Sequence, residues 1–242
     1  MKNNILFVCA IVYIASAPMC NAGGSQTGTS IQHNPMAGMR DFFPLSVGSR
    51  WEYNIYSLDS NGRKVPGSDR KEYDSITGLE AVDDRTAYAM HSTIGDSVQP
   101  PEYFSFDQQG NLWSYVHTGR GKRDGYWRIF AAFSDTVAGE LDTTYAFATV
   151  GDDHFADTVQ QTYHGDGPMT VSAGDFWMRM YSYDVNASLV TRVISGNMEL
   201  TGRLYFARGV GKIKETNFKT LSSQYLNTSG GTYKELVSYS VK

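Results

Sequence analysis

Residues 42–56, which read FFPLSVGSRWEYNIY, decide the fold of this chain because a stiff apolar lead-in runs directly into a two-sided strand. Pro44 fixes its backbone φ and removes one amide donor, and Gly48 can turn where a residue with a Cβ cannot. In the strand that follows, alternate side chains point to opposite faces. The apolar face carries Trp51, Tyr53 and Ile55, and the polar face carries Glu52 and Asn54. The pattern predicts a strand with one face on a core and the other in water.

Residues 1–22 predict a secretory signal peptide, and therefore an exported protein of the periplasm or the extracellular space. Lys2 supplies the positive start, and the apolar run over residues 5–17 is short for a membrane-spanning helix. Cys20-Asn21-Ala22 has the small-x-small pattern of a cleavage site. Two alternatives stay open: an uncleaved membrane anchor, and lipid attachment at Cys20, where Met19 takes the place of the usual small residue.

The rest of the chain is predicted to be a flexible tether over residues 23–40 and a single β domain over residues 41–242. Both cysteines, Cys9 and Cys20, lie in the leader, so the domain should hold neither a disulfide nor a thiolate metal site. We predict no cofactor. The formal net charge of -4 argues against a nucleic-acid partner. No second apolar stretch is long enough to predict a transmembrane segment.

From Asp41 onward the apolar residues recur at period two, and turn clusters interrupt them. This pattern predicts an all-β fold, with at most a minor helix. Residues 103–106 and 112–117 flank a strong hairpin signal, and residues 198–206 form the clearest amphipathic strand. Gly202 interrupts that strand, which predicts a bend, a bulge or a close backbone approach. The polar residues 157–163 predict an edge strand or one that faces water on both sides.

Three pieces of the chain together resemble the TapB-type family of exported bacterial proteins of unknown function. They are residues 43–53, 171–176 and 205–214, and residues 233–239 follow them in the same order. The resemblance implies a single antiparallel sheet curved into an unclosed barrel, similar to the periplasmic lipoprotein-carrier fold, and no established activity. The chain departs from the family pattern at Arg208, where proline is common, and in a polar insertion around residues 151–167.

The candidate ligand-binding residues combine a cationic turn with aromatic neighbours. Glycines between the cations of the turn could admit a phosphate or an acidic sugar, and aromatics beside cations could hold a glycan or a lipid headgroup. A solvated turn and an ordinary sheet core are the alternatives. The cations are Arg120, Lys122, Arg123 and the nearby Arg128, and the aromatics are Trp113, Tyr115, Tyr126 and Trp127.

Two further segments hold chemistry-bearing residues. Ser97 lies in a Gly-Asp-Ser-Val sequence that resembles the nucleophile block of the Gly-Asp-Ser-Leu hydrolases, but the Asp-x-x-His block of those enzymes is missing. Residues 152–166 carry the densest run of hard metal ligands, although without a recognised ligand spacing, and we interpret them as a solvated acidic loop. These ligands are Asp152, Asp153, His154, Asp157, His164 and Asp166. We predict no catalytic residue and no metal.

The leading hypothesis is a non-enzymatic exported β-protein that binds an apolar or amphipathic ligand, such as a lipid or a lipoprotein part, on a concave sheet face. A glycan is another possible partner. The first alternative is an envelope interaction module whose edge strands pair with another protein. The second is a hydrolase that uses Ser97 or the Asp152–Asp166 loop.

Overall fold

The computed structural model describes residues 38–117, 125–135, 137–139, 141–150, 153–190, 195–223 and 227–242. Its described regular elements are one short 3-10 turn and thirteen strands. The first elements are η2 (Arg40–Phe42), β1 (Arg50–Leu58), β2 (Arg70–Val82), β3 (Arg85–Ile94), β4 (Ser97–Val98), β5 (Glu102–Phe106) and β6 (Leu112–His117). The remaining strands are β7 (Gly125–Ala131), β8 (Leu141–Val150), β9 (Asp153–Val171), β10 (Gly174–Val190), β11 (Ser195–Ala207), β12 (Gly211–Ser223) and β13 (Asn227–Ser240).

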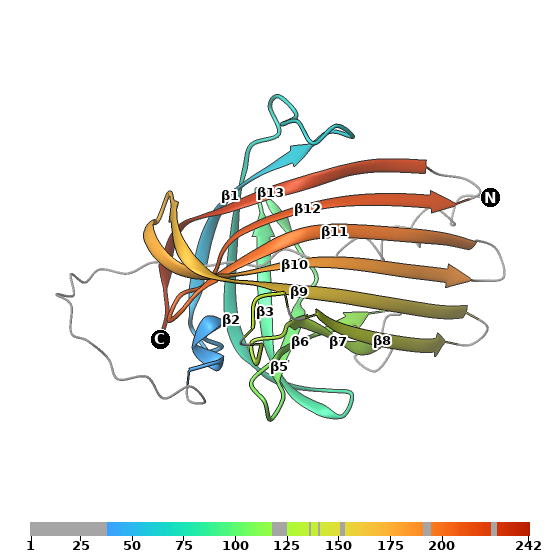
Figure 1. Cartoon of the computed structure of the whole chain (residues 1–242), viewed down its shortest axis with the longest axis horizontal. Helices are drawn as coiled ribbons and strands as arrows, with labels where there is room; N and C mark the ends of the chain where they lie inside the picture. Colours follow the sequence, from blue (N-terminus) through green and yellow to red (C-terminus); the bar gives the residue numbers. More distant parts are fainter. Residues whose placement is uncertain are drawn as a thin grey trace.

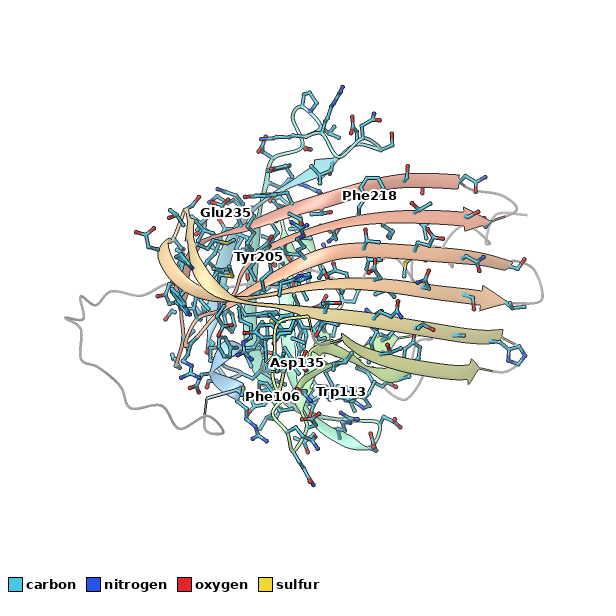
Figure 2. The ribbon with its side chains drawn as sticks, in the orientation of Figure 1. Phe106, Trp113, Asp135, Tyr205, Phe218 and Glu235 are labelled. Atoms are coloured by element: carbon cyan, nitrogen blue, oxygen red, sulfur yellow. The ribbon has the colours of Figure 1, made fainter. Side chains whose placement is uncertain are left out.

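All of these strands belong to one antiparallel sheet. Its order is β7-β6-β5-β3-β2-β1-β13-β12-β11-β10-β9-β8, with β4 paired to β3 off this path. The long strands β9 to β13 cross the group that contains β1, β2 and β3 (Figure 1), and the side chains drawn in Figure 2 are densest where the two groups overlap. The sheet therefore folds over itself into a nearly closed barrel whose seam lies between β7 and β8. This confirms the prediction of a curved, unclosed antiparallel sheet.

The stretch that opens the domain lies at the centre of the core. Trp51, Tyr53 and Ile55 are all buried on one face of β1, here called the inner face. The Trp51 indole donates to the carbonyl of Val210 at 2.6 Å, and the Tyr53 hydroxyl donates to the carbonyl of Lys212. Phe43, which precedes β1, packs against Trp51, Phe104 and Phe206. The lead-in and the strand thus join the two halves of the sheet.

Two glycines and one turn of the sequence segments discussed above lie in close contact with other strands. Gly211 has a φ of +107°, and a Cβ there would lie 3.3 Å from the Trp51 indole nitrogen. Gly202 is a site of close approach, one of the three roles that its place in an amphipathic strand predicted: a Cβ there would lie 2.4 Å from the Thr216 carbonyl oxygen. The 172–175 turn likewise meets the last strand, because Ala173 N–H donates to the carbonyl of Leu236 at 3.1 Å.

The predictions of an edge or water-exposed strand over residues 157–163, and of a solvated acidic loop over the surrounding segment 152–166, are wrong. The described part of this segment belongs to β9, which runs unbroken from Asp153 to Val171 and lies between β8 and β10 rather than at an edge. Asp157, Val159, Gln161 and Tyr163 are all buried on the inner face of β9. A solvated loop does not form because the polar members of this set find hydrogen-bonding partners inside the barrel. Among the described residues, no helix has the length and apolar character needed to cross a bilayer.

Candidate functional site

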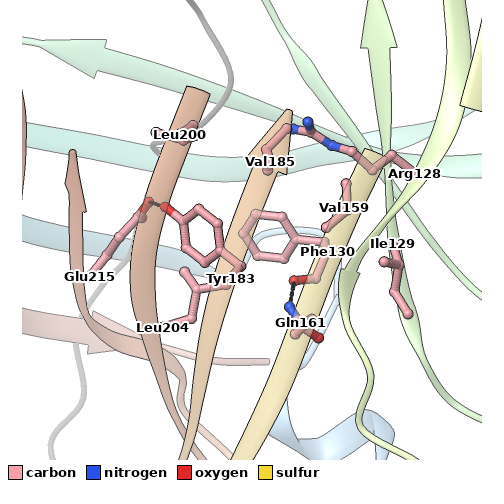
Figure 3. A pocket seen from close by; sticks show the side chains of 10 residues that line it. All are labelled: Arg128, Ile129, Phe130, Val159, Gln161, Tyr183, Val185, Leu200, Leu204 and Glu215. Carbon is pink, nitrogen blue, oxygen red and sulfur yellow. Dashed lines mark hydrogen bonds between the residues drawn. The ribbon is translucent and has the colours of Figure 1, made fainter. Parts of the chain in front are cut away.

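The inner face of the sheet is filled by the chain's own side chains. One continuous core cluster joins residues from β1, β2, β3 and β5 to residues from β9 to β13. The cavity in Figure 3, between β7 and β9 to β12, measures about 30 Å³ and is lined by residues that include Phe130, Val159 and Tyr183. That volume is enough for about one or two water molecules. This cavity does not hold an acyl chain.

A buried ion pair lies next to that cavity. Lys212 and Glu215 bind each other through ammonium and carboxylate, with side chains 1% and 2% exposed. The hydroxyl of Tyr183 and the amide of Asn217 also donate to Glu215, at 3.4 Å and 3.3 Å. Burial alone would raise the pKa of Glu215, but Lys212, Lys234 and the Asn217 amide hold it below its ordinary value. Glu215 is therefore a carboxylate whose charge is compensated inside the barrel.

A second buried group of charges lies on β2 and β13. The Lys234 ammonium lies 3.0 Å from a carboxylate oxygen of Glu72 and over the Tyr53 ring, 4.5 Å from its centroid. Asp74 lies two residues from Glu72 on the same face and is 3% exposed. Burial, and next the negative charge of Glu72, raise the pKa of Asp74 well above its ordinary value. Together the two groups tie β2, β12 and β13 across the interior, which is a structural role.

One end of the sheet, β7, is sealed by side chains from across the seam. Gln161 on β9 donates to the carbonyl of Phe130 at 2.9 Å (Figure 3) and accepts from the amide of Ala132 at 2.6 Å, as a neighbouring strand would. Asp157 accepts from Tyr126 and from Arg128, both at 2.9 Å. Two main-chain groups near the end of β7, the Phe130 carbonyl and the Ala132 amide, are thus already paired, which protects this part of the edge against other strands.

The other end of the sheet, β8, lies across the seam from β7, with Cα atoms of the two strands within 8 Å of each other, but no side-chain hydrogen bond to its main chain is described. β8 pairs with β9 over its whole length, from Leu141 opposite Thr162 to Val150 opposite Asp153, without a register shift. No described strand pairs with its second edge. Its sequence, LDTTYAFATV, holds one charged residue, no proline and no lysine. Edge strands are usually protected by lysine, proline, bulges or short length, and β8 has none of these.

The predicted ligand-binding residues are divided between the faces of the sheet. Trp113, Tyr115 and Trp127 lie on the outer face, where the guanidinium of Arg85 stacks 5.0 Å from the Trp113 ring and 4.9 Å from the Trp127 ring. Tyr126 points inward to Asp157 instead. Arg120, Lys122 and Arg123 lie outside the described residues. The structure therefore brings Trp113 and Trp127 together around a cation, Arg85, which the sequence analysis did not single out, and Tyr115 packs against Trp127 with ring centroids 5.2 Å apart.

The segments considered for hydrolysis do not form a catalytic arrangement among the described residues. Ser97 is exposed in the two-residue strand β4, and no described hydrogen bond joins its hydroxyl to a histidine. His164 contacts the hydroxyl of Ser182 at 2.7 Å, and Asp166 binds Arg179 at 3.0 Å. The described residues contain no group of three or more potential ligands that could hold a metal ion. Asp152 lies outside the described part.

Sequence reasoning missed Asp157 and Gln161 as residues that seal the seam. A signal for them was present: Asp157, Val159, Gln161 and Tyr163 alternate at the period of a strand, and the set mixes polar with apolar residues. The sequence alone does not distinguish a buried aspartate or glutamine from an exposed one. Asp157 and Gln161 are identified as buried only by the positions of their partners, Arg128 and the main chain of β7.

Comparisons with known proteins add a fold likeness and no family. No family model matches the chain, and no curated protein matches it. One similar solved structure, from Parabacteroides distasonis ATCC 8503, is described as a "putative lipoprotein"; the identity is 12%, the TM-score 0.45, and the match covers 82% of this chain and 98% of the other. Another, from Bacteroides fragilis NCTC 9343, is described as a "putative exported protein with YmcC-like fold", at 11% identity, TM-score 0.41 and the same coverage. The resemblance to the TapB-type family stays a prediction.

Proposed function

We propose that this chain is an exported, non-enzymatic interaction module that binds an extended segment of another envelope protein along β8. Export rests on the leader-like residues 1–22. The observation that carries the binding role is the difference between the two ends of the sheet. The end at β7 is closed by Gln161 and Asp157, whereas β8 offers a regular ten-residue edge with a single charge.

Strand addition suits such an edge because the main chain supplies the hydrogen bonds and alternate side chains supply the specificity. An added strand next to β8 would extend the antiparallel order that already runs through the sheet. The carrier role on the inner face remains a prediction, and the cavity of about 30 Å³ gives it no support. The hydrolase role likewise has no arrangement of described residues in its favour.

The proposal is tested by photo-crosslinking in the producing cells. A benzophenone amino acid is placed at Thr143, an exposed position of β8, and in a control protein at Val98, which is 74% exposed on β4. The Thr143 protein should give one discrete adduct with a second protein that the Val98 protein does not give. No adduct, or identical adducts from both positions, contradicts the proposal. An adduct with a second copy of this chain contradicts the assignment of a different envelope protein.

Proline substitutions at Thr144 and Tyr145 provide a matched pair. Successive amides of a strand point to opposite edges, so one of the two prolines removes a donor from the β9 ladder and the other removes an outward donor. The variant that keeps the wild-type melting temperature is the one whose proline removes an amide from the outward edge of β8. It should lose the Thr143 adduct, and if it retains that adduct, binding does not run along β8.

A further inference from the structure

We propose that the outer face of β1, β2, β3 and β13 carries a binding site for a short acidic oligosaccharide. A hollow of about 790 Å³ lies on this face, outside the core and away from β8. Its volume falls in the range of small-ligand sites, about 300–1,000 Å³. The inference is independent of strand addition, because it uses a different face and different strands.

The hollow is built from two straight rows of polar residues, and the sheet register fixes both. In the first row, Arg50 lies opposite Ser240 on one side and Ser75 on the other, and Ser75 lies opposite His91. Because neighbouring strands lie about 4.8 Å apart, a row across four strands spans about 14 Å. We call the hollow along these rows the groove; a row of this length suits a chain-like ligand that lies across the strands.

The second row places an aromatic ring beside hydroxyl and carboxylate groups. Glu52 lies opposite Ser238 and Tyr73, and Tyr73 lies opposite Thr93. Tyr73 is 49% exposed although it is a large aromatic residue in the middle of a sheet. An exposed ring flanked by hydroxyls offers a flat apolar surface for a sugar ring and hydrogen-bonding groups for its hydroxyls.

The charges of the groove favour an anionic ligand. Glu52 is already neutralised, since the Lys71 ammonium lies 2.5 Å from one of its oxygens and the Ser238 hydroxyl donates to the other at 3.1 Å. Arg50 is exposed and belongs to none of the ion pairs found among the described residues, and exposed Lys242 lines the same hollow. A guanidinium free of a carboxylate can bind one from a ligand in a bidentate manner. Asp74 also belongs to the lining of the hollow, but its side chain is 3% exposed and lies on the inner face, so the exposed charges without a carboxylate partner are those of Arg50 and Lys242.

The test uses isothermal titration of the full-length protein with tetragalacturonate, and with maltotetraose as the neutral tetrasaccharide. We expect binding of the acidic tetramer that is at least tenfold tighter than that of the neutral one. Arg50→Gln and Tyr73→Ala should each weaken it at least tenfold. Arg63→Gln, which removes an exposed arginine in the turn after β1, should leave it unchanged. Circular dichroism melting establishes that each variant is folded.

Several results would overturn the proposal. They are the absence of binding at millimolar tetragalacturonate, equal binding of the neutral tetramer, and equal losses in Arg50→Gln and Arg63→Gln. Equal binding by a tetraglutamate peptide would show that charge alone is recognised and would overturn the assignment to a sugar. Nuclear magnetic resonance titration of the wild type keeps the test independent of the variants: amides of β1, β2 and β3 in the groove should shift, and shifts confined to other strands would contradict the site.

Discussion

Removing the ammonium group of Lys212 tests whether the polar interior of this barrel is structural. In Lys212→Met, Glu215 loses its ion-pair partner while both positions remain in the core, where their side chains are 1% and 2% exposed. Tyr183 and Asn217 still donate to the carboxylate, but neither supplies a positive charge. Breaking a buried ion pair by deleting one partner costs about 3–5 kcal/mol of unfolding free energy. For a domain of this size that corresponds to a melting temperature lower by roughly 6–20 °C.

The matched control is Lys64→Met, which breaks the exposed pair of Lys64 with Asp69, where the charged atoms lie 2.5 Å apart. Exposed pairs contribute about 0–1 kcal/mol, so this variant should unfold close to wild type in urea. The double variant Lys212→Met/Glu215→Leu removes both charges and should recover most of the stability that the single variant loses. Urea unfolding at pH 7, followed by circular dichroism, measures all three.

The pH dependence of the same series gives a second measure. Because the pKa of Glu215 in the folded protein lies below its ordinary value, the pair contributes stability above about pH 4.3, and that stability is lost as the pH falls through the folded pKa. In Lys212→Met burial should raise the pKa of Glu215, so the loss of stability on acidification should become smaller, and it should turn into a gain if that pKa exceeds the ordinary value. If Lys212→Met costs no more than Lys64→Met, the interior pair is not structural and the reasoning is refuted.

Three other substitutions test the remaining features of the fold. Asp74→Asn should stabilise the protein increasingly as the pH rises from about 4. The pKa of Asp74 is raised in the folded protein, so wild type loses stability over that range and the variant does not. A stability difference that does not change with pH would contradict the raised pKa of Asp74. Gly202→Ala should lower the free energy of unfolding in urea by about 1–3 kcal/mol, because its Cβ would lie 2.4 Å from the Thr216 carbonyl oxygen. The control Gly78→Ala, whose Cβ would meet nothing within 4 Å, should stay within about 1 kcal/mol of wild type. Gln161→Leu should lower the free energy of unfolding by about 1–3 kcal/mol and speed hydrogen exchange of the Ala132 amide, which loses its acceptor. An unchanged exchange rate at Ala132 would show that Gln161 does not seal β7.

Period-two patterning was sufficient to predict the class of fold and most of its strands. The alternation of Trp51, Tyr53 and Ile55 identified the inner face of β1, and the glycine in residues 198–206 was correctly interpreted as a possible close approach. These features depend on local geometry and burial, which the sequence carries directly.

The polar parts of the molecule could not be predicted in the same way. Asp157 and Gln161 belong to a stretch that resembles a solvated loop, yet they are buried because Arg128 and the main chain near the end of β7 lie opposite them. Their partners are about 30 residues away in the chain, and the pairing exists only once the sheet has folded over itself. The outer groove is equally non-local, since β1 and β13 come from opposite ends of the domain.

Hydrogen exchange of the backbone amides at the two ends of the sheet tests most directly the claim that one end is closed and the other open. The Ala132 amide, which donates a hydrogen bond to the Gln161 side chain, should be protected from exchange in the isolated protein. In β8, every second amide between Leu141 and Val150 should exchange rapidly, because only one edge of that strand is paired. Slow exchange at all of the β8 amides would mean that both of its edges are hydrogen-bonded, and would contradict the account.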